Sequence, residues 1–391
     1  MAQSELQEGA GGFASEFDGP RGCGPYELAP TLDLINWVFR GERPAPDRAP
    51  GRVTMGWDYA HIYHPQNLDN VRIVQHRASG QIVSSVGIYE TRVRTPRGQV
   101  AVGGINAVAT HPEFRRRGLS TATLEDALAK MRADGLHVGL LGTGIPHFYR
   151  RLGWERAGMQ PVFALDRGNV SFLPDPEQSG LEVTEDWRPC AAELAAMHNA
   201  ESLGASRTPG SFVLLAERRL DRVVVARRGG VPVAYAGLWR DQVREYGGET
   251  ETVAALLRAV FNALDDPSLS STERLPDQRH AFELTVWTPP VAPAACDDGL
   301  PQRLAGIGLP VRITYQGMLK ILDPPALFAA LDLADVDLEA GDGAWRLHHR
   351  GRTLGLPERA LVKLVFGPER YAGFAPHFFP VPFYQWPAER V

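Results

Sequence analysis

The stretch from Gly103 to Trp154 constrains the fold more than any other part of this 391-residue chain. It opens with the apolar sequence INAVAT, passes through the basic segment Arg115–Gly118, and runs directly into an amphipathic segment. A strand that leads through a glycine-containing turn into a helix gathers free N–H groups and the positive end of the helix dipole at one point. Arginines on the same turn add donors that suit phosphate oxygens. The pattern therefore predicts a binding site for a pyrophosphate.

Hydrophobic spacing defines the elements on either side of this loop. Leu124, Leu128 and Met131 recur at helical spacing, so we expect a helix over residues 120–132. The following segment, 137–144, is apolar on both faces, as a central strand should be, and its exit glycines allow close approach to the backbone. A hairpin pattern and a second turn precede the stretch. The sequence therefore predicts a mixed α/β (α+β) unit with helices flanking its sheet.

The spacing of the loop differs from that of the two commoner phosphate-binding loops. There is no G-x-x-x-x-G-K-[ST], and no G-x-G-x-x-G follows a strand. The chain instead reads R-x-x-G-x-S after V-A-T-H-P, and further on it reads HFYRRLGW, which contains Tyr149. These two motifs, in this order and at this separation, resemble the loop Q/R-x-x-G-x-G/A and the motif F-Y-x-x-x-G-F/Y of the GCN5-related N-acetyltransferases.

The resemblance implies a cofactor and a set of site residues. In that family the strand before the loop lies along the pantetheine arm of acetyl-CoA, the loop amides hold the pyrophosphate, and the tyrosine protonates the leaving thiolate. Carried over to this sequence, the resemblance makes Tyr149 the general acid. The alternative is a purely structural role, in which Tyr149 is an aromatic side chain that packs on a short helix. The cofactor-binding residues that it implies are Val108, Ala109, Thr110, Arg116, Arg117, Gly118, Leu119, Ser120, Thr121, Gly144 and Ile145.

Length and composition divide the chain into units. A chain of 391 residues exceeds one ordinary domain. We expect a disordered lead over 1–25, a catalytic acetyltransferase unit over 26–165, a degenerate second unit of the same kind over 166–290, and a third unit over 291–391. The second unit is predicted to bind no cofactor, because Glu249 follows its R-x-x-G at Arg244 and would place a carboxylate against a pyrophosphate.

The order of units resembles the enhanced-intracellular-survival family of acetyltransferases. Members of that family have two tandem acetyltransferase units and a C-terminal unit similar to sterol carrier protein, and they form hexamers. The segments GMLKILDPPALFAAL and LVFGPE carry the likeness in the last unit. The resemblance implies an α+β sterol-carrier-like domain, a homo-oligomer, and a terminal carboxylate, here that of Val391, which acts as general base in the first unit.

Composition excludes several other classes of protein. The net charge of -5 argues against a nucleic-acid footprint, and no apolar run is long enough for a membrane span. The N-terminal sequence does not look like a secretory signal, and three widely spaced cysteines favour a reducing cytoplasm. His61 and His64 form an H-x-x-H pair, but no third ligand lies at suitable spacing, so we expect no metal site.

Three functions remain open at this point. The leading hypothesis is an acetyl-CoA-dependent N-acetyltransferase that acts on a small-molecule amine, such as an aminoglycoside or a polyamine. The second is a non-catalytic protein that binds acyl-CoA or lipid through its last unit. The third is an acetyltransferase that acts on protein amines. Trp37 and Phe39 belong to a predicted helix, and the resemblance implies that such a helix shapes the acceptor pocket, but core packing is the preferred interpretation of either residue alone.

Overall fold

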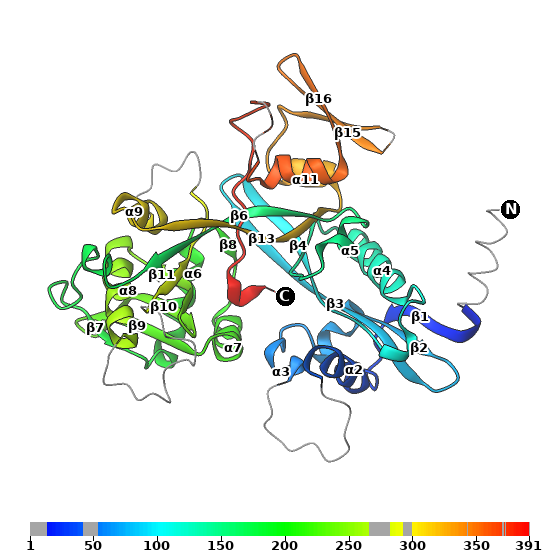
Figure 1. Cartoon of the computed structure of the whole chain (residues 1–391), viewed down its shortest axis with the longest axis horizontal. Coiled ribbons are helices and arrows are strands. Elements are labelled where there is room, and N and C mark those ends of the chain that lie inside the picture. The colour runs from blue at the N-terminus through cyan, green and yellow to red at the C-terminus, as the bar shows by residue number, and fades with distance from the viewer. Residues whose placement is uncertain are drawn as a thin grey trace.

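The computed structural model describes residues 14–41, 54–265, 282–291, 299–341, 343–369, 371 and 373–390. Its centre is one mixed sheet of 13 strands with helices on both faces. Figure 1 shows two lobes side by side and a smaller third lobe above them. This architecture confirms the predicted α/β class. No helix in the described ranges is long and apolar enough to cross a membrane.

The first half of the sheet is an antiparallel meander that ends in a parallel strand. β1 to β4 pair in sequence order, and helix α4 returns the chain so that β5 lies parallel to β4. The elements are β1 (Phe17–Gly22), α2 (Leu28–Arg40), α3 (Met55–Asp58), β2 (Val71–His76), β3 (Gln81–Thr95), β4 (Gly98–Thr110), α4 (Leu119–Ala133), β5 (Val138–Leu141), α5 (Pro146–Arg150) and β6 (Glu155–Leu165).

The second half of the sheet repeats this order of elements. A short additional strand, β8 (Gly204–Ala205), pairs with the end of β3 and so ties the two halves together. The elements are β7 (Glu182–Thr184), α6 (Ala191–Ala200), α7 (Pro209–Arg219), β9 (Arg222–Arg228), β10 (Val231–Trp239), β11 (Gln242–Gly248), α8 (Thr250–Leu264), β12 (Leu284–Trp287), α9 (Leu300–Gly306) and β13 (Val311–Ile321).

The two halves exchange their last strands. β6, which ends the first repeat, pairs with β12 of the second, and β13, which ends the second repeat, pairs with β5 of the first. β6 and β13 also pair with each other, so the sheet is continuous across the molecule. Because α9 and β13 complete the second repeat, the domain boundary predicted between residues 290 and 291 falls inside that repeat.

The beginning of the chain differs from the sequence prediction. Residues 1–25 were expected to be a disordered lead, but β1 pairs with β2, and the Phe17 side chain is buried at 2% exposure. Burying a phenylalanine stabilises the folded state by about 1.5–3 kcal/mol, which outweighs the polar composition around it. Residues 1–13 lie outside the described ranges.

A bulge in β4 reorganises the faces of the first repeat. Ser85 pairs with Ala109 but Gly87 pairs with Asn106, so β4 has one extra residue there. Ala107 takes a positive φ of 45° at this point, and such a bulge reverses the alternation of side chains. Consequently Ile105 packs with the α4 core, whereas Ala107 packs with the core beneath α2.

The third lobe covers one face of the first repeat. It consists of α10 (Pro324–Ala330), the three-stranded sheet β14 (Asp337–Gly341), β15 (Ala344–His349) and β16 (Arg352–Pro357), and helix α11 (Glu358–Phe366). Apolar side chains of α10 and α11 share one core with side chains of β3, β4 and β5. The likeness of residues 291–391 to sterol carrier protein stays a prediction.

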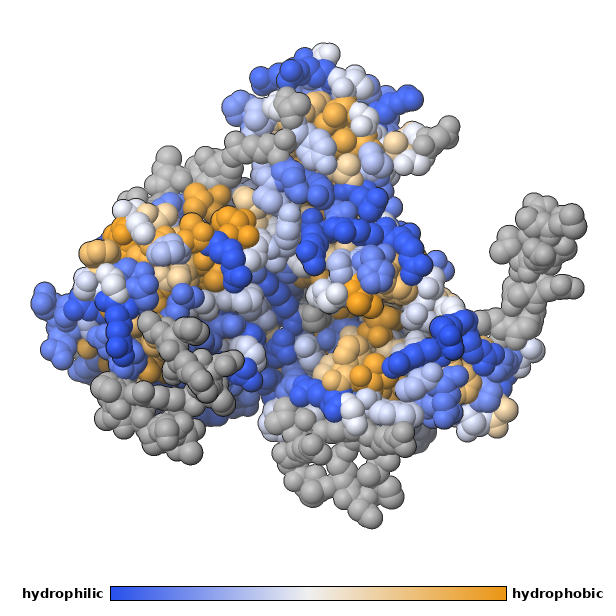
Figure 2. Space-filling view, in the orientation of Figure 1, coloured by the Kyte–Doolittle hydropathy of each residue, from blue (hydrophilic) through white to orange (hydrophobic). Residues whose placement is uncertain are grey.

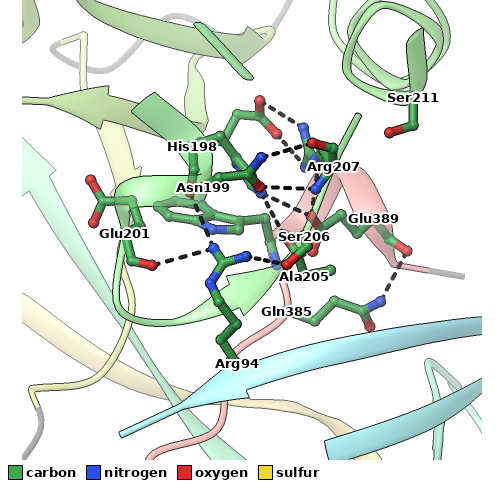
Figure 3. A network of polar contacts seen from close by, with 12 residues as sticks. Arg94, His198, Asn199, Glu201, Ala205, Ser206, Arg207, Ser211, Gln385 and Glu389 are labelled. Carbon is green, nitrogen blue, oxygen red and sulfur yellow. Dashed lines mark hydrogen bonds and ion pairs between the residues drawn. The ribbon is translucent and has the colours of Figure 1, made fainter. Parts of the chain in front are cut away.

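After α11 the chain returns to the centre of the molecule. It ends there in the 3₁₀ turn η5 (Pro387–Glu389), drawn in red in Figure 1. Glu389 lies in a fully buried ionic network, in which it accepts a hydrogen bond from Arg207 Nε at 2.8 Å and lies 3.3 Å from His198 Nε2. Figure 3 shows these three side chains pointing toward one another. The network therefore anchors the tail to the second repeat.

Candidate functional site

A cavity of about 690 Å³ lies where β4, α4 and α5 meet. Ladder pairing between β4 and β5 stops at Gly104 and Leu140, while β4 continues to Thr110, so the two strands part beneath the cavity. Most of the predicted cofactor-binding residues line it. The complete lining is Val38, Val108, Thr110, Phe114, Arg115, Arg116, Gly118, Leu119, Ser120, Thr121, Ile145, Phe148, Tyr149 and Arg151.

The N-terminus of α4 forms one end of the cavity. Gly118 is its N-cap with a φ of 76°, and a side chain at this position would meet no atom within 4 Å. The first helical amide with a partner is that of Ala122, which donates to the Gly118 carbonyl. The amides of Leu119, Ser120 and Thr121 therefore precede the helical ladder and remain available to an anion.

Two arginines surround this helix end. Arg115 and Arg116 are exposed at the cavity, and Arg116 adopts a positive φ of 63° that turns the chain into the helix. Arg117 points elsewhere, because its side chain pairs with Glu16 and lies 4.9 Å over the Phe17 ring. Of Arg117, only the backbone is thus left to serve the predicted role in cofactor binding.

The end of β4 forms the floor of the cavity. The Thr110 hydroxyl is buried and has no hydrogen-bond partner within the described part of the chain. Val108 and Thr110 line the cavity, but Ala109 between them is fully buried beneath α2. An unsatisfied buried hydroxyl costs about 1–3 kcal/mol. A polar ligand that forms a hydrogen bond with the Thr110 hydroxyl would remove this cost. Gly144, also predicted to contact cofactor, is not part of the lining.

Tyr149 lies at the other end of the cavity, on α5. Its ring makes edge contacts with Phe148, at 4.9 Å between centroids, and with Trp154, at 6.4 Å. The side chain is 7% exposed, and burial raises the pKa of its phenol. The hydroxyl has no hydrogen-bond partner in the described ranges, so a proton donor is available at a water-poor position that the cavity reaches.

Sequence reasoning missed several residues of the lining. Phe114, Phe148 and Arg151 lie within or beside the two motifs, and Val38 comes from α2. The first three were detectable by proximity, since they are within a few positions of the loop or of Tyr149. Val38 carries no such signal, because only the packing of α2 brings it to the cavity.

The corresponding place in the second repeat is much smaller. α8 begins at Thr250, two residues after β11 ends, and Glu249 occupies its N-cap. The cavity beside it measures about 90 Å³ and is lined in part by Glu201. The absence of a cofactor from this repeat stays a prediction, and the acidic lining and small volume favour it.

Burial raises the pKa of Glu201 to about 7, against a smaller lowering by Arg94. A carboxyl with a raised folded-state pKa stabilises the fold fully below its unfolded pKa and loses that contribution as pH rises through 7. The free energy of unfolding should fall between pH 4 and pH 8 in the wild type. In Glu201→Gln we expect this fall to be smaller by about 2 kcal/mol. Urea titrations at both pH values measure this change. Glu193→Gln, on the exposed side of α6, is the control, and an equal change in both variants would contradict the assignment.

Other predicted residues lie apart from the cavity. Within the described residues no group of three potential ligands is placed to hold a metal. Phe39 is 50% exposed, and Trp37 contacts the His111 ring at 4.7 Å between centroids. Val391 lies outside the described residues. Arg390 before it is held in place, because its Nη1 donates to Gln160 at 2.8 Å and its carbonyl accepts from Arg219 at 3.0 Å.

Comparison with known proteins agrees with this geometry. Residues 25–157 match the family described as Acetyltransferase (GNAT) domain. An uncharacterised N-acetyltransferase of Streptomyces coelicolor is 28% identical over 174 residues, which are 39% of this chain and 41% of that protein. The match thus spans less than half the length of that relative.

Solved structures share the fold over most of the chain. A GCN5-related N-acetyltransferase from Anabaena variabilis has a TM-score of 0.57 at 15% identity, covering 93% of this chain and 92% of its own. One from Kribbella flavida has a TM-score of 0.54 at 17% identity, covering 85% and 81%. Eis1 from Mycobacterium abscessus has a TM-score of 0.53 at 14% identity, covering 89% of each chain. At these identities the likeness concerns the fold alone.

Proposed function

From the acetyltransferase (GNAT) domain over residues 25–157, we propose that the protein is an acetyl-CoA-dependent N-acetyltransferase that acts on a small-molecule amine. One observation carries the proposal: a single cavity joins the free amides of the α4 N-terminus to the phenol of Tyr149. The first feature suits a pyrophosphate, and the second suits a leaving thiolate. Location in the cytoplasm and assembly into a homo-oligomer remain predictions from the sequence.

The residues of the cavity fit the parts of acetyl-CoA. The amides of Leu119, Ser120 and Thr121, with the exposed side chain of Arg116, would hold the pyrophosphate. The orphaned hydroxyl of Thr110 would bond the pantetheine arm on the floor. The bound cofactor supplies the thioester carbonyl that the amine attacks.

The reaction then requires a base, a group that stabilises the oxyanion, and an acid for the leaving thiolate. A base takes a proton from the ammonium, the neutral nitrogen attacks the thioester carbonyl, and backbone N–H groups at the β4 bulge near Val108 stabilise the oxyanion. The carbon–sulfur bond breaks as the oxyanion collapses, and Tyr149 donates its proton to the thiolate. The attacking nitrogen loses its second proton to become a neutral amide, and that proton restores the phenol of Tyr149. The proposed base is the carboxylate of Val391, on the resemblance described above, and the clamped position of Arg390 supports this proposal.

Gly118 provides the test of cofactor binding. Gly118→Gln introduces a side chain at a positive φ, which costs about 1–2 kcal/mol at a non-glycine residue. Gly118→Glu adds the same strain and also a carboxylate beside the pyrophosphate. We expect Gly118→Glu to bind acetyl-CoA about tenfold more weakly than Gly118→Gln, because of like-charge repulsion at the helix N-terminus.

Calorimetric titration of acetyl-CoA into the wild type and both variants measures this difference. The Gln variant separates backbone strain from charge at the same position. Equal dissociation constants for the two variants would show that the α4 N-terminus does not hold the pyrophosphate. A wild type that fails to bind acetyl-CoA would overturn the proposed function.

A further inference from the structure

A second cavity, of about 520 Å³, lies between α3 of the first repeat and α7 of the second. We call this space, together with the nearby residues Arg219, Arg244 and Arg390, the interunit cleft. Figure 2 shows hydrophilic side chains gathered in the hollow between the two large lobes. The cleft is bridged by aromatic side chains of one repeat and arginines of the other. Arg218 lies 3.1 Å over the Trp57 ring, and Arg219 lies 4.4 Å over the Tyr59 ring.

Two further arginines come close to this pair. Arg390, at the end of the described tail, accepts a hydrogen bond from Arg219 through its carbonyl. Arg244 is the extra residue of a bulge in β11, because Gly237 pairs with Glu245 while Leu238 pairs with Val243. Burial, together with Arg219 and Arg390, lowers the pKa of Arg244 to about 10. Arg219, Arg244 and Arg390 therefore form one electrostatically coupled cluster, and Arg218 is the neighbour of Arg219 on α7.

The cluster lacks carboxylate partners. Arg188 and Arg222, at the same cavity, pair with Glu217 and Glu185. In contrast, Arg218, Arg219, Arg244 and Arg390 form no ion pair within the described ranges, and their polar contacts are neutral, to Gln242, Gln385, Gln160 and the Arg390 carbonyl.

The acidic groups that influence the cluster form no ion pair with its arginines in the described part of the chain. Asp221 accepts a hydrogen bond of 2.7 Å from the backbone of Arg240, and Glu389 pairs with Arg207. The Nε atoms of Arg218 and Arg219 are buried and have no hydrogen-bond partner in the part of the chain that the structure describes. Aromatic rings of Trp239 and Trp287 lie beside Arg244, but a partly desolvated guanidinium without a carboxylate partner still attracts an oxyanion that can accept several hydrogen bonds.

Packing contacts through the core beneath α2 connect the cluster to the acetyl-CoA cavity. Tyr59 and Tyr89 pack against the core that contains the bulge residue Ala107, and Val38 belongs to both that core and the cavity. Between them His61 contacts the Tyr89 ring at 4.7 Å between centroids, and both of its ring nitrogens are buried with no hydrogen-bond partner among the described residues. Burial, followed by Arg219 and Arg207, lowers the pKa of His61 to about 3, so the positive field extends to this point.

We propose that the acceptor amine carries an anionic group, a carboxylate or a phosphate, which binds Arg219 and Arg244 in the interunit cleft. The amino group of such a molecule would then face the thioester near the β4 bulge. This inference rests on the proposed function and narrows its substrate class. A polycationic amine, such as an aminoglycoside or a polyamine, would be repelled by the same cluster.

Matched amines with and without an anionic group test the proposal. Lysine and cadaverine, tyrosine and tyramine, and phosphoethanolamine and ethanolamine differ mainly in that group. We expect the wild type to prefer the anionic member of at least one pair by about tenfold or more in kcat/KM, since a charge-assisted hydrogen bond contributes about 1.5–3 kcal/mol. In Arg244→Gln this preference should fall about tenfold through KM, with kcat unchanged, and Arg244→Lys should restore part of it.

Controls separate the possible outcomes. Arg228→Gln, at the exposed last residue of β9, should leave the preference unchanged. A preference that is the same in wild type and Arg244→Gln overturns the proposal. If Arg244→Gln lowers kcat equally for both members of every pair, the proposal is also overturned. The cluster would then hold a carboxylate of the chain itself, such as that of Val391. In that case a chain extended beyond Val391 would lose activity toward all amines alike.

A binding measurement distinguishes this inference from the proposed function. If no amine is acetylated, the proposed function fails. Calorimetry with the products N-acetyl-lysine and N-acetylcadaverine still tests the cleft, with tighter binding of the carboxylate expected in the wild type and lost in Arg244→Gln. Equal affinities in the wild type would overturn the anion site by itself.

Discussion

Tyr149→Phe should lower kcat by about 10²–10³-fold while the dissociation constant for acetyl-CoA changes less than about twofold. The variant removes one hydroxyl and keeps the ring contacts with Phe148 and Trp154. Positioned general acids contribute about 10²–10⁴-fold to rate, and the buried phenol of Tyr149 is the acid proposed at this end of the cavity. Thiol release, measured with saturating acetyl-CoA and amine, reports kcat, and calorimetry reports cofactor binding.

The pH dependence of the wild type supplies a second readout. Because burial raises the pKa of Tyr149, its phenol remains protonated throughout the neutral range, and we expect it to cause no loss of kcat there as pH rises. Tyr26→Phe, at a position 96% exposed, is the matched control for loss of a phenol. An unchanged single-turnover rate in Tyr149→Phe would show that another group, or water, protonates the thiolate.

Arg207→Ala should destabilise the folded protein by about 3–5 kcal/mol, the typical cost of leaving buried charges without their partner. Arg207 donates two hydrogen bonds to Glu245, at 3.1 and 2.9 Å, and one to Glu389. Burial disfavours the charged form of Arg207, but Glu245 and Glu389 outweigh burial and raise its pKa. Removing Arg207 therefore leaves two buried carboxylates uncompensated, and denaturant unfolding measures the loss.

An exposed ion pair provides the control. Arg167 is 67% exposed and pairs with Asp265, and Arg167→Ala should cost less than about 1 kcal/mol. Burial raises the pKa of Glu389, but Arg207 and His198 outweigh it and lower that pKa to about 2. The stabilisation from Glu389 is thus present above its unfolded pKa and is lost as pH falls toward 2. Equal costs for Arg207→Ala and Arg167→Ala would contradict the assigned role of the network.

Local patterns predicted the elements around the loop better than they predicted the connections of the sheet. The helix expected over 120–132 is observed as Leu119–Ala133, because hydrophobic spacing and a terminal glycine define a helix locally. The loop residues and Tyr149 share one cavity for the same reason: they belong to consecutive elements. Residue roles in that cavity remain proposals.

Features that depend on distant partners were not predictable in this way. No local signal states that β13 pairs with β5, since any apolar strand satisfies an edge of the sheet. The interunit cleft joins α7, a bulge in β11 and the tail, so its arginines are scattered along the sequence. The polar composition around β1 suggested disorder, and only its pairing with β2 reveals how Phe17 becomes buried.

The exchanged strands also bear on synthesis of the chain. Val138 of β5 pairs with Ile321 of β13, so the sheet of the first repeat is completed only after residue 321 has left the ribosome. Until then β5 and β6 present unpaired edges, which are the features of a nascent chain most prone to mispairing. Contacts between residues so far apart in sequence also slow folding. We therefore expect the two repeats to mature together as one cooperative unit, although the acetyl transfer proposed above involves a cavity of only the first.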